Sequence, residues 1–185
     1  AIDTVDRGSG LLRDAAYRPS PNCDDRPEGA AIDLLVVHCI SLPAGEFGGP
    51  WVDALFTNTL DPQAHASFAD LEGLRVSAHL VIHRDGAAVQ YVPFHRRAWH
   101  AGVSCYGARE RCNDFSIGIE LEGVDTVPYT PAQYQRLARV TAALLRTYPS
   151  LTPECIAGHC DIAPGRKTDP GPAFEWDRFR RLLKD

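Results

Sequence analysis

Three side chains of types that bind metal ions well stand at the end of a predicted strand and in one short loop. His38 ends the apolar run IDLLVVH, while His159 and Asp169 lie ten residues apart in the glycine- and proline-rich segment GHCDIAPGRKTDPGP. Two imidazoles and one carboxylate suit Zn²⁺, and a set of three ligands leaves one coordination position for water. The pattern is typical of a catalytic zinc site, because a structural zinc ion is closed by four protein ligands.

Other histidines offer weaker ligand sets. His79 and His83 are four residues apart, but on a predicted strand that spacing separates the side chains by roughly 13 Å. This distance is too large for one ion, so we expect both to be structural or surface residues. His65, His95 and His100 have no partner at a spacing that indicates a metal site.

Two cysteines adjoin the candidate ligands. Neighbouring residues on a strand face opposite sides, so Cys39 should not share an ion with His38. Cys160 follows His159 in a loop, where this argument does not apply. Thiolates bind zinc well, and Cys160 therefore remains an alternative ligand.

Catalysis at such a site needs a base and a group that stabilises the developing oxyanion. Glu120 and Glu122 alternate with apolar residues at the end of FSIGIELEG, and Lys167 lies two residues before Asp169. Glu120 is deeper in the apolar run, where desolvation raises a carboxyl pKa and makes the group a better base near neutrality. Lys167 could reach a carbonyl oxygen at the metal. Each of these residues could instead form a salt bridge at the surface.

The elements that must position these residues alternate between strands and helices. Apolar runs and alternation predict strands over 32–38, 76–83, 87–92, 115–121 and 155–157, the second and third joined by a turn at Asp85-Gly86. Helical periodicity predicts helices over 51–60, 130–148 and from about 172 to 183. This order predicts a single α/β domain with a central mixed β-sheet flanked by helices. Gly118 inside a strand indicates the close approach of a neighbour.

The helix over 130–148 has the clearest start signal. Thr130 is the expected N-cap, Pro131 occupies the first helical position, and Gln133 completes a capping box. An apolar stripe at helical spacing should pack into the core. Its members are Tyr134, Leu137, Thr141, Leu144, Leu145 and Tyr148.

Length and composition narrow the class of protein. A chain of 185 residues buries about 70% of its surface on folding, so it can form a core without disulfides. The net charge of −5 and the absence of a basic surface argue against nucleic-acid binding. No run approaches the ~20 apolar residues of a membrane helix. We expect the six cysteines to be free thiols in a reducing compartment, and residues 1–31, rich in Asp, Arg, Pro and Gly, to be irregular.

Several long motifs together resemble the AmpD-type amidases. They are LLVVHCISLPAGEFGGPW, DPQAH, LRVSAHLVIHRDG, RAWHAGVS, RERCNDFSIGIELEG and GHCDIAPGRKTDPGPAF. These enzymes are cytoplasmic N-acetylmuramyl-L-alanine amidases that act on anhydromuramyl peptides and share the zinc amidase and peptidoglycan-recognition fold. The resemblance covers about residues 17–183, which implies an amidase domain over 17–185 after an irregular segment, 1–16.

The resemblance assigns roles to the residues singled out above. It implies that His38, His159 and Asp169 hold one zinc ion per chain, that Glu120 is the catalytic carboxylate and that Lys167 stabilises the transition state.

The resemblance also implies a substrate-binding set. Arginines that match Arg75 and Arg111 hold anionic and polar groups of the substrate, for which the guanidinium fork is well suited. Trp99 matches an aromatic residue of the cleft, although core packing explains it equally well. Cys39 departs from the family pattern VVHNISLP, and a thiol cannot replace both the donor and the acceptor of an asparagine amide.

The resemblance implies hydrolysis of the amide between the muramyl lactyl group and L-alanine. We expect a cytoplasmic monomer that serves cell-wall recycling and, by implication, control of β-lactamase induction. Two alternatives are a muropeptide-binding module without activity and an exported amidase that cuts polymeric peptidoglycan. Non-catalytic relatives usually lack a zinc ligand, whereas this chain keeps all three candidates.

Overall fold

The computed structural model describes residues 2–185. Its strands are β1 (Val5–Asp6), β2 (Leu11–Leu12), β3 (Ala16–Tyr17), β4 (Cys23–Asp24), β5 (Leu34–Ile40), β6 (Leu80–Ile82), β7 (Ala88–Gln90), β8 (Arg97–Ala98), β9 (Cys105–Tyr106), β10 (Arg109–Glu110), β11 (Ser116–Glu122) and β12 (Ile156–Gly158). Its helices are α1 (Trp51–Phe56), α2 (Pro131–Thr147), α3 (His159–Ile162) and α4 (Trp176–Lys184), with the 3₁₀ helices η1 (Ala66–Leu71) and η2 (Cys112–Asp114).

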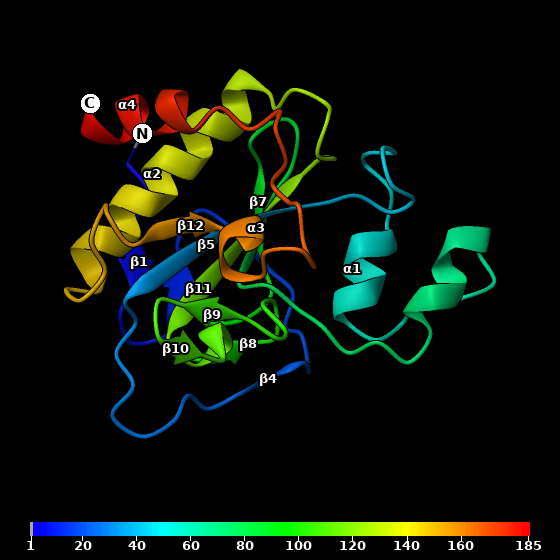
Figure 1. The fold of residues 1–185 in the computed structure, drawn as a ribbon, viewed down its shortest axis with the longest axis horizontal. Helices are drawn as coiled ribbons and strands as arrows, with labels where there is room; N and C mark the ends of the chain where they lie inside the picture. The colour runs from blue at the N-terminus through cyan, green and yellow to red at the C-terminus, as the bar shows by residue number, and fades with distance from the viewer. Residues whose placement is uncertain (1) are drawn as a thin grey trace.

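A six-stranded mixed sheet lies at the centre of the molecule (Figure 1). The strand order is β12-β5-β11-β6-β7-β3, and the first four strands are parallel to one another. β7 returns antiparallel to β6, and β3 pairs parallel to β7. The α/β class and the mixed sheet predicted from the sequence are therefore confirmed.

Alternation along β5 and β11 divides their side chains between two environments. Leu35, Val37, Ile117 and Ile119 pack in the main core with the buried face of α2. The intervening residues of both strands lie on the opposite face of the sheet, and Leu34 and Val36 pack there in a second cluster. His38 and Glu120 continue this second set, so the pleat places both on the face away from α2.

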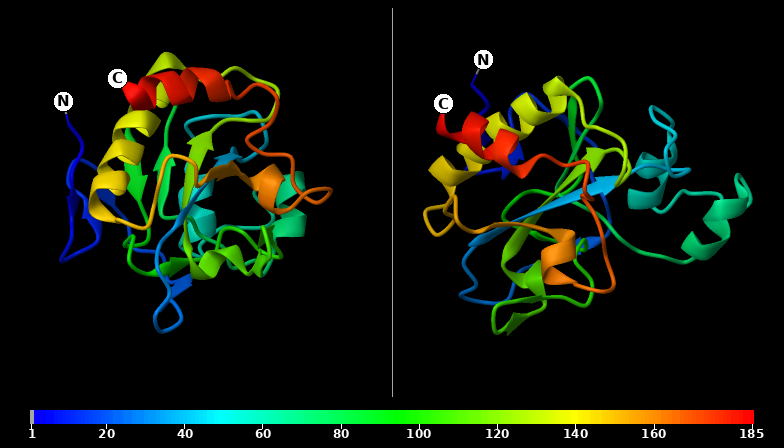
Figure 2. Two further views of the ribbon diagram at one scale, coloured as in Figure 1. Left: turned by 60° about the vertical axis from the view of Figure 1, so that its left-hand side comes forward. Right: turned by 45° about the horizontal axis from the view of Figure 1, so that its top comes forward.

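Helix α2 begins as its sequence predicts. The Thr130 hydroxyl accepts a hydrogen bond from the Gln133 backbone N–H, and the Gln133 side chain accepts one from the Thr130 N–H. The buried Gln133 amide also donates to the carbonyl oxygens of Ile82 and Glu122. One side chain thus caps the helix and joins it to two strands. Figure 2 shows α2 and α4 packed together over one side of the sheet.

Two helices are shorter than predicted. α1 ends at Phe56 rather than at residue 60, because Asn58 adopts a left-handed conformation with φ 61°. α4 begins at Trp176 rather than near Pro172, because the preceding segment forms turns. There, the Ala173 N–H donates to the Asp125 carbonyl instead of starting a helix.

Strands β6 and β7 are also shorter than predicted, because pairing with both neighbours is confined to 80–82 and 88–90. The loop that contains His159 forms the short helix α3. Short strands also occur within residues 1–31, where the sequence led us to expect irregular structure, and β3 joins the central sheet. Two-residue strands carry too little alternation to be recognised in a sequence.

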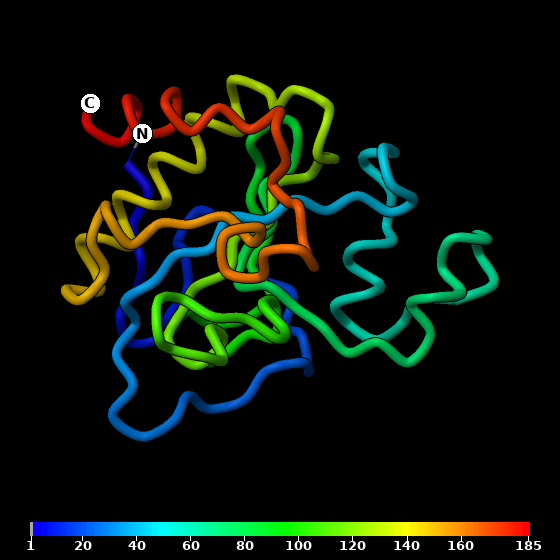
Figure 3. Tube along the Cα trace, viewed as in Figure 1, coloured from blue at the N-terminus to red at the C-terminus, as the bar shows by residue number. Residues whose placement is uncertain are grey.

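Residues 41–76 form a helical lobe that carries α1 and η1 and projects to one side of the sheet (Figure 3). Within residues 2–185, no helix is both long and apolar enough to cross a membrane. All six cysteines are free thiols.

Candidate metal centre and active site

The candidate ligands meet at the carboxyl ends of parallel strands. His38 lies near the end of β5, and the parallel register pairs it with Glu120 of β11. His159 directly follows β12, the neighbour of β5 on its other side, and begins α3. Asp169 comes from the loop after α3, whose path returns so that the Asp169 carbonyl accepts a hydrogen bond from the Cys160 N–H.

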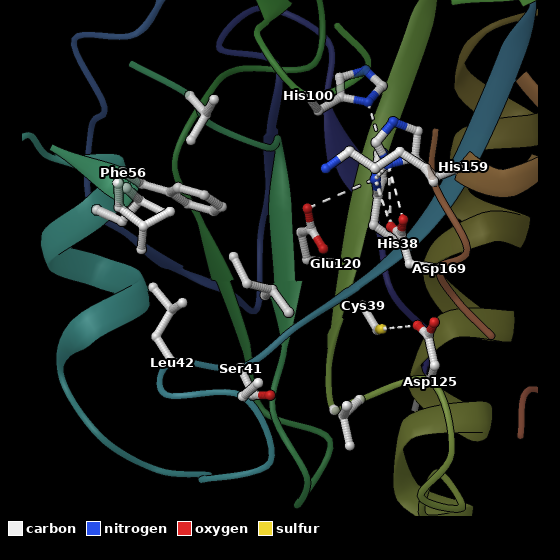
Figure 4. A pocket seen from close by; sticks show the side chains of 18 of the residues that line it. His38, Cys39, Ser41, Leu42, Phe56, His100, Glu120, Asp125, His159 and Asp169 are labelled. Carbon is white, nitrogen blue, oxygen red and sulfur yellow. Dashed lines mark hydrogen bonds and ion pairs between the residues drawn. The ribbon is translucent and has the colours of Figure 1, made fainter. Parts of the chain in front are cut away.

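Three side chains converge on one point (Figure 4). The Nδ1 atoms of His38 and His159 are 3.0 Å apart. The Asp169 carboxylate lies 3.2 Å from Nδ1 of His38 and 3.1 Å from Nδ1 of His159. Within residues 2–185, this convergent set contains neither Cys39 nor Cys160.

The donor set fits a tetrahedral zinc site. Ligand atoms about 2.0–2.1 Å from zinc in tetrahedral geometry are roughly 3.3 Å apart, close to the three separations observed. Nε2–H of His159 donates to the Ala101 carbonyl at 3.1 Å, which leaves the lone pair of the ring on Nδ1, toward the other ligands. A backbone carbonyl in this position is a common feature of metal-binding histidines.

Burial and neighbouring side chains set the protonation of His38 and Asp169. Burial lowers the pKa of His38 to about 4, although the nearby Asp169 carboxylate acts in the opposite direction. Burial also raises the pKa of Asp169, but the adjacent His159 and His38 side chains outweigh it and hold that pKa well below its usual range. A neutral imidazole and an ionised carboxylate are the forms that bind a metal ion.

Glu120 is buried beside the ligands without a hydrogen-bond partner of its own. Its Oε1 lies 3.8 Å from Nδ1 of His38, and its buried Oε2 has no hydrogen-bond partner. Burial raises the pKa of Glu120 well above its usual range, the charge of Asp169 adds to this effect, and the charge of Lys167 opposes it. The group therefore has a free oxygen and an increased affinity for a proton, as a general base requires.

A cleft of about 560 Å³ opens from this centre. The metal-ligand candidates, Glu120 and Lys167 line one side. The helical lobe contributes an apolar wall opposite them, which includes Leu42 and Phe56 (Figure 4). The cleft thus places a cluster of polar, ionisable side chains across from an apolar surface.

The predicted substrate-binding residues are distributed unevenly. Trp99 lines the cleft, and its indole N–H donates to Asp24 at 3.2 Å. Arg75 is exposed and lines a smaller pocket of about 200 Å³ within the lobe. Arg111 adopts a left-handed backbone conformation and lines another pocket with Arg166. The structure therefore does not bring the two predicted arginines into the central cleft.

Cys39 points away from the convergent ligands. Its side chain packs against the main core, and its thiol donates to the Asp125 carboxylate at 3.4 Å. Burial raises the pKa of the Cys39 thiol, so the group stays protonated and can donate. Asp125 also accepts from the Thr168 hydroxyl. The thiol thus reaches the loop that carries Asp169 only through Asp125, which accepts from both Cys39 and Thr168.

His79 and His83 have structural partners. Nε2–H of His79 donates to the Arg96 carbonyl at 2.8 Å, and its Nδ1 accepts from the Gly118 N–H at 3.1 Å. Nδ1 of His83 lies 3.4 Å from Glu122. These contacts agree with the expectation that both residues are structural.

Sequence reasoning missed His100, whose Nδ1 lies 2.8 Å from Nε2 of His38. No spacing relates these residues, which are 62 positions apart. The available signal was Gly118, which indicated a close neighbour. A Cβ atom at position 118 would lie 2.5 Å from the His100 ring.

Residues 28–172 match the family model of N-acetylmuramoyl-L-alanine amidase. The chain belongs to this amidase family. Among its relatives, the 1,6-anhydro-N-acetylmuramyl-L-alanine amidase AmpD of Escherichia coli is 66% identical over 94% of both chains. AmpD of Haemophilus influenzae is 51% identical over 95% of both chains.

Solved structures of amidases have the same fold. A crystal structure of a selenomethionine derivative of AmpD superposes with a TM-score of 0.93 at 63% identity, over 97% of this chain and 98% of that one. The amidase AmiD of Escherichia coli, in complex with anhydro-N-acetylmuramic acid-L-Ala-D-γ-Glu-L-Lys, gives a TM-score of 0.61 at 30% identity, over 85% of this chain and 60% of that one.

Proposed function

We propose that this chain is a zinc-dependent amidase that hydrolyses the bond between anhydro-N-acetylmuramic acid and the L-alanine of a muropeptide. The observation that carries the proposal is the convergence of His38, His159 and Asp169 beside the unpartnered Glu120 carboxylate. Family membership supports the reaction type, and the similarity to AmpD, whose name specifies the anhydro sugar, supports the substrate.

His38, His159 and Asp169 would hold one zinc ion, with a coordination position open toward the cleft. When bound, zinc increases the acidity of a water molecule and polarises the carbonyl oxygen of a substrate. The three ligands need no rearrangement for this role, because their donor atoms already lie within 4.8 Å of one another.

Glu120 and Lys167 would move protons and balance charge during the reaction. Glu120 takes a proton from the attacking water and returns it to the nitrogen of the departing L-alanine. Its raised pKa favours the first transfer, and its free Oε2 gives it an open acceptor position. Lys167 lines the same cleft and would stabilise the negative charge that develops on the lactyl carbonyl oxygen.

Different parts of the substrate would occupy the cleft and its two neighbouring pockets. The apolar wall of the lobe and Trp99 are suited to the sugar ring, because aromatic and apolar surfaces complement its carbon face. Arg111 and Arg75 line two pockets that each share lining residues with the cleft, where they would bind carboxylates or polar groups of the muropeptide.

We also propose that the protein acts as a cytoplasmic monomer in cell-wall recycling and, by implication, limits the muropeptide signal that induces β-lactamase. Six free thiols suit a reducing compartment. All residues of the proposed mechanism come from one chain, so the site does not need a second copy.

The test is incubation of the protein with a purified anhydromuramyl tripeptide, followed by mass spectrometry. We expect release of the free peptide and the anhydro sugar, loss of activity after chelation, and its recovery with zinc. Binding without cleavage would instead identify a muropeptide-binding module. Activity that persists after the metal is removed would contradict the zinc mechanism.

A parallel assay on intact sacculi separates the recycling enzyme from an exported amidase. We expect the anhydromuropeptide to be cut much faster than polymeric peptidoglycan. The opposite preference would support the exported enzyme and contradict the proposed substrate.

A further inference from the structure

One two-residue segment contacts both candidate histidine ligands. The His100 side chain lies against His38, with Nδ1 of His100 2.8 Å from Nε2 of His38. The next residue, Ala101, presents its carbonyl oxygen to Nε2 of His159 at 3.1 Å. The ligands are 121 positions apart in the sequence. Even so, the ring nitrogens that face away from the other ligands contact two adjacent residues.

Several independent contacts fix this segment in place. The Asn113 side-chain carbonyl accepts hydrogen bonds from the backbone N–H groups of His100 and Ala101, at 3.1 and 2.8 Å. The Arg166 guanidinium donates to the Ala101 carbonyl at 2.7 Å. Gly118 leaves the space for the imidazole, because a Cβ atom there would lie 2.5 Å from Cγ of His100.

His38, His100 and Ser116 form a hydrogen-bonded chain. Its protons can be arranged in two orders, which differ in the direction of each hydrogen bond. The far nitrogen of the His100 ring, Nε2, lies 3.0 Å from the buried hydroxyl of Ser116. In the first order, Nε2–H of His38 donates to Nδ1 of His100, and Nε2–H of His100 donates to Ser116. In the second order, Ser116 donates to His100, His100 donates to His38, and the His38 proton is on Nδ1.

Only the first order lets His38 act as a ligand. A ligating Nδ1 must carry a lone pair, so the proton of the neutral ring must be on Nε2. That proton needs an acceptor in this buried position, and Nδ1 of His100 is the atom that accepts it. The same requirement at His159 is met by the Ala101 carbonyl.

We propose that His100 is a positioning residue that fixes His38 in the metal-binding tautomer, and that Asn113 holds His100 and Ala101 to orient both histidine ligands together. This inference rests on the proposed zinc site. According to this inference, residues outside the ligand set orient both imidazoles. The space that the His100 ring needs also explains why β11 has a glycine at position 118.

A matched pair of substitutions tests the role of His100. Asparagine and leucine have the same branched shape, but only Asn places an acceptor near the position of Nδ1. We expect His100→Leu to weaken zinc binding about 10- to 100-fold and His100→Asn to stay within a few-fold of the wild type. Zinc affinity is measured by competition with a chromophoric chelator, and circular dichroism of the metal-free proteins checks folding.

Equal affinities in both variants and the wild type would overturn the proposal, and so would an equal loss in two folded variants, which would indicate a packing role alone. If the wild type binds no zinc, the proposed function itself fails. If the wild type binds and His100→Leu binds equally well, only this inference fails.

A second measurement needs no substitution. Long-range ¹H–¹⁵N NMR spectra of the zinc-loaded wild type report which ring nitrogen carries a proton. We expect His100 to be protonated on Nε2 and to have a bare Nδ1. A proton on Nδ1 of His100 would contradict the first order and overturn the proposal, even if the variants do not fold.

Discussion

The candidate metal centre and the helical lobe form opposite sides of one cleft but are built differently. The candidate ligands His38 and His159 are 1% and 5% exposed. His38 lies on a strand of the central sheet, His159 directly follows one, and both ring nitrogens of each have neighbouring polar atoms. The lobe carries one six-residue α-helix, one 3₁₀ helix and connecting turns, and its Leu74 is 45% exposed. The candidate centre is thus held by paired strands, whereas the facing wall is held by the packing of Leu55 and Phe56 against apolar residues of the sheet and by a few long-range hydrogen bonds.

Those few contacts can be identified. Asn22, in the N-terminal segment, is 1% exposed and contacts the lobe. Its amide donates to Asn58 and to the Val76 carbonyl, both at 2.8 Å. The Ser20 hydroxyl donates to the Phe56 carbonyl at 2.5 Å. The part of the chain that carries no predicted chemistry therefore supports the wall of the cleft.

Two glutamates of β11 show the same contrast within one strand. Glu120 has an oxygen without a partner beside the ligands. Glu122, two residues on, accepts hydrogen bonds from the N–H groups of Gly48 in the lobe and Arg84, at 2.8 and 3.1 Å. Glu120 therefore has a carboxylate oxygen available for chemistry, whereas Glu122 has a structural role because it holds two backbone N–H groups. A buried carboxylate without partners is costly for stability, so its presence indicates function.

The largest effect should come from breaking the metal centre. We expect Asp169→Ala to lose zinc and amidase activity together, because two remaining imidazoles bind the ion weakly. Metal analysis of the purified protein and the anhydromuropeptide assay measure both losses. The exposed Asp177 of α4 provides the control, and Asp177→Ala should keep both. Normal zinc content in Asp169→Ala would contradict the ligand assignment.

The next largest effect should distinguish the two glutamates. We expect Glu120→Gln to keep its zinc but to lower kcat by about 100-fold or more, because an amide cannot accept the proton. Glu122→Gln loses one acceptor for a backbone N–H and should cost about 1–3 kcal/mol of stability. Its kcat should fall far less than that of Glu120→Gln. Steady-state kinetics and thermal unfolding measure these effects, and similar kcat values in the two variants would remove Glu120 from the mechanism.

The smallest effect should be confined to the lobe. Asn22→Ala leaves the Val76 carbonyl and the Asn58 amide without their buried partner, at a cost of about 1–3 kcal/mol. We expect faster hydrogen exchange in residues 51–76, a higher KM and unchanged zinc affinity. Unchanged exchange, or a loss of zinc, would show that the two sides of the cleft are not independently supported.

The elements around the candidate site were largely predictable, because they depend on patterns of neighbouring residues. The apolar run before His38 and the alternation around Glu120 indicated strands, and the pleat of a strand fixes which side chains share a face. The capping box at Thr130 likewise predicted the start of α2 from three neighbouring residues. These features depend on residues close in the sequence, so they can be recognised from the sequence alone.

Other features depended on long-range packing. The early end of α1 goes with the left-handed Asn58, whose side chain bonds to Asn22, 36 positions away, and the late start of α4 goes with a hydrogen bond between Ala173 and Asp125. The N-terminal segment looked irregular because its strands are only two residues long: β1 and β2 pair with each other, and β3 and β4 pair with the distant strands β7 and β8. No periodicity in the sequence encodes such pairings.

The sequence by itself determined the candidate donor groups, two imidazoles and a carboxylate, and the strands that end beside them. Only the tertiary structure decided which nitrogen of each imidazole faces the cleft. That choice depends on His100 and Ala101, which are 62 and 58 positions from the histidines they contact. Side-chain chemistry is a property of single residues, whereas the tautomer of a buried ring is set by whatever acceptor the folded chain places against it.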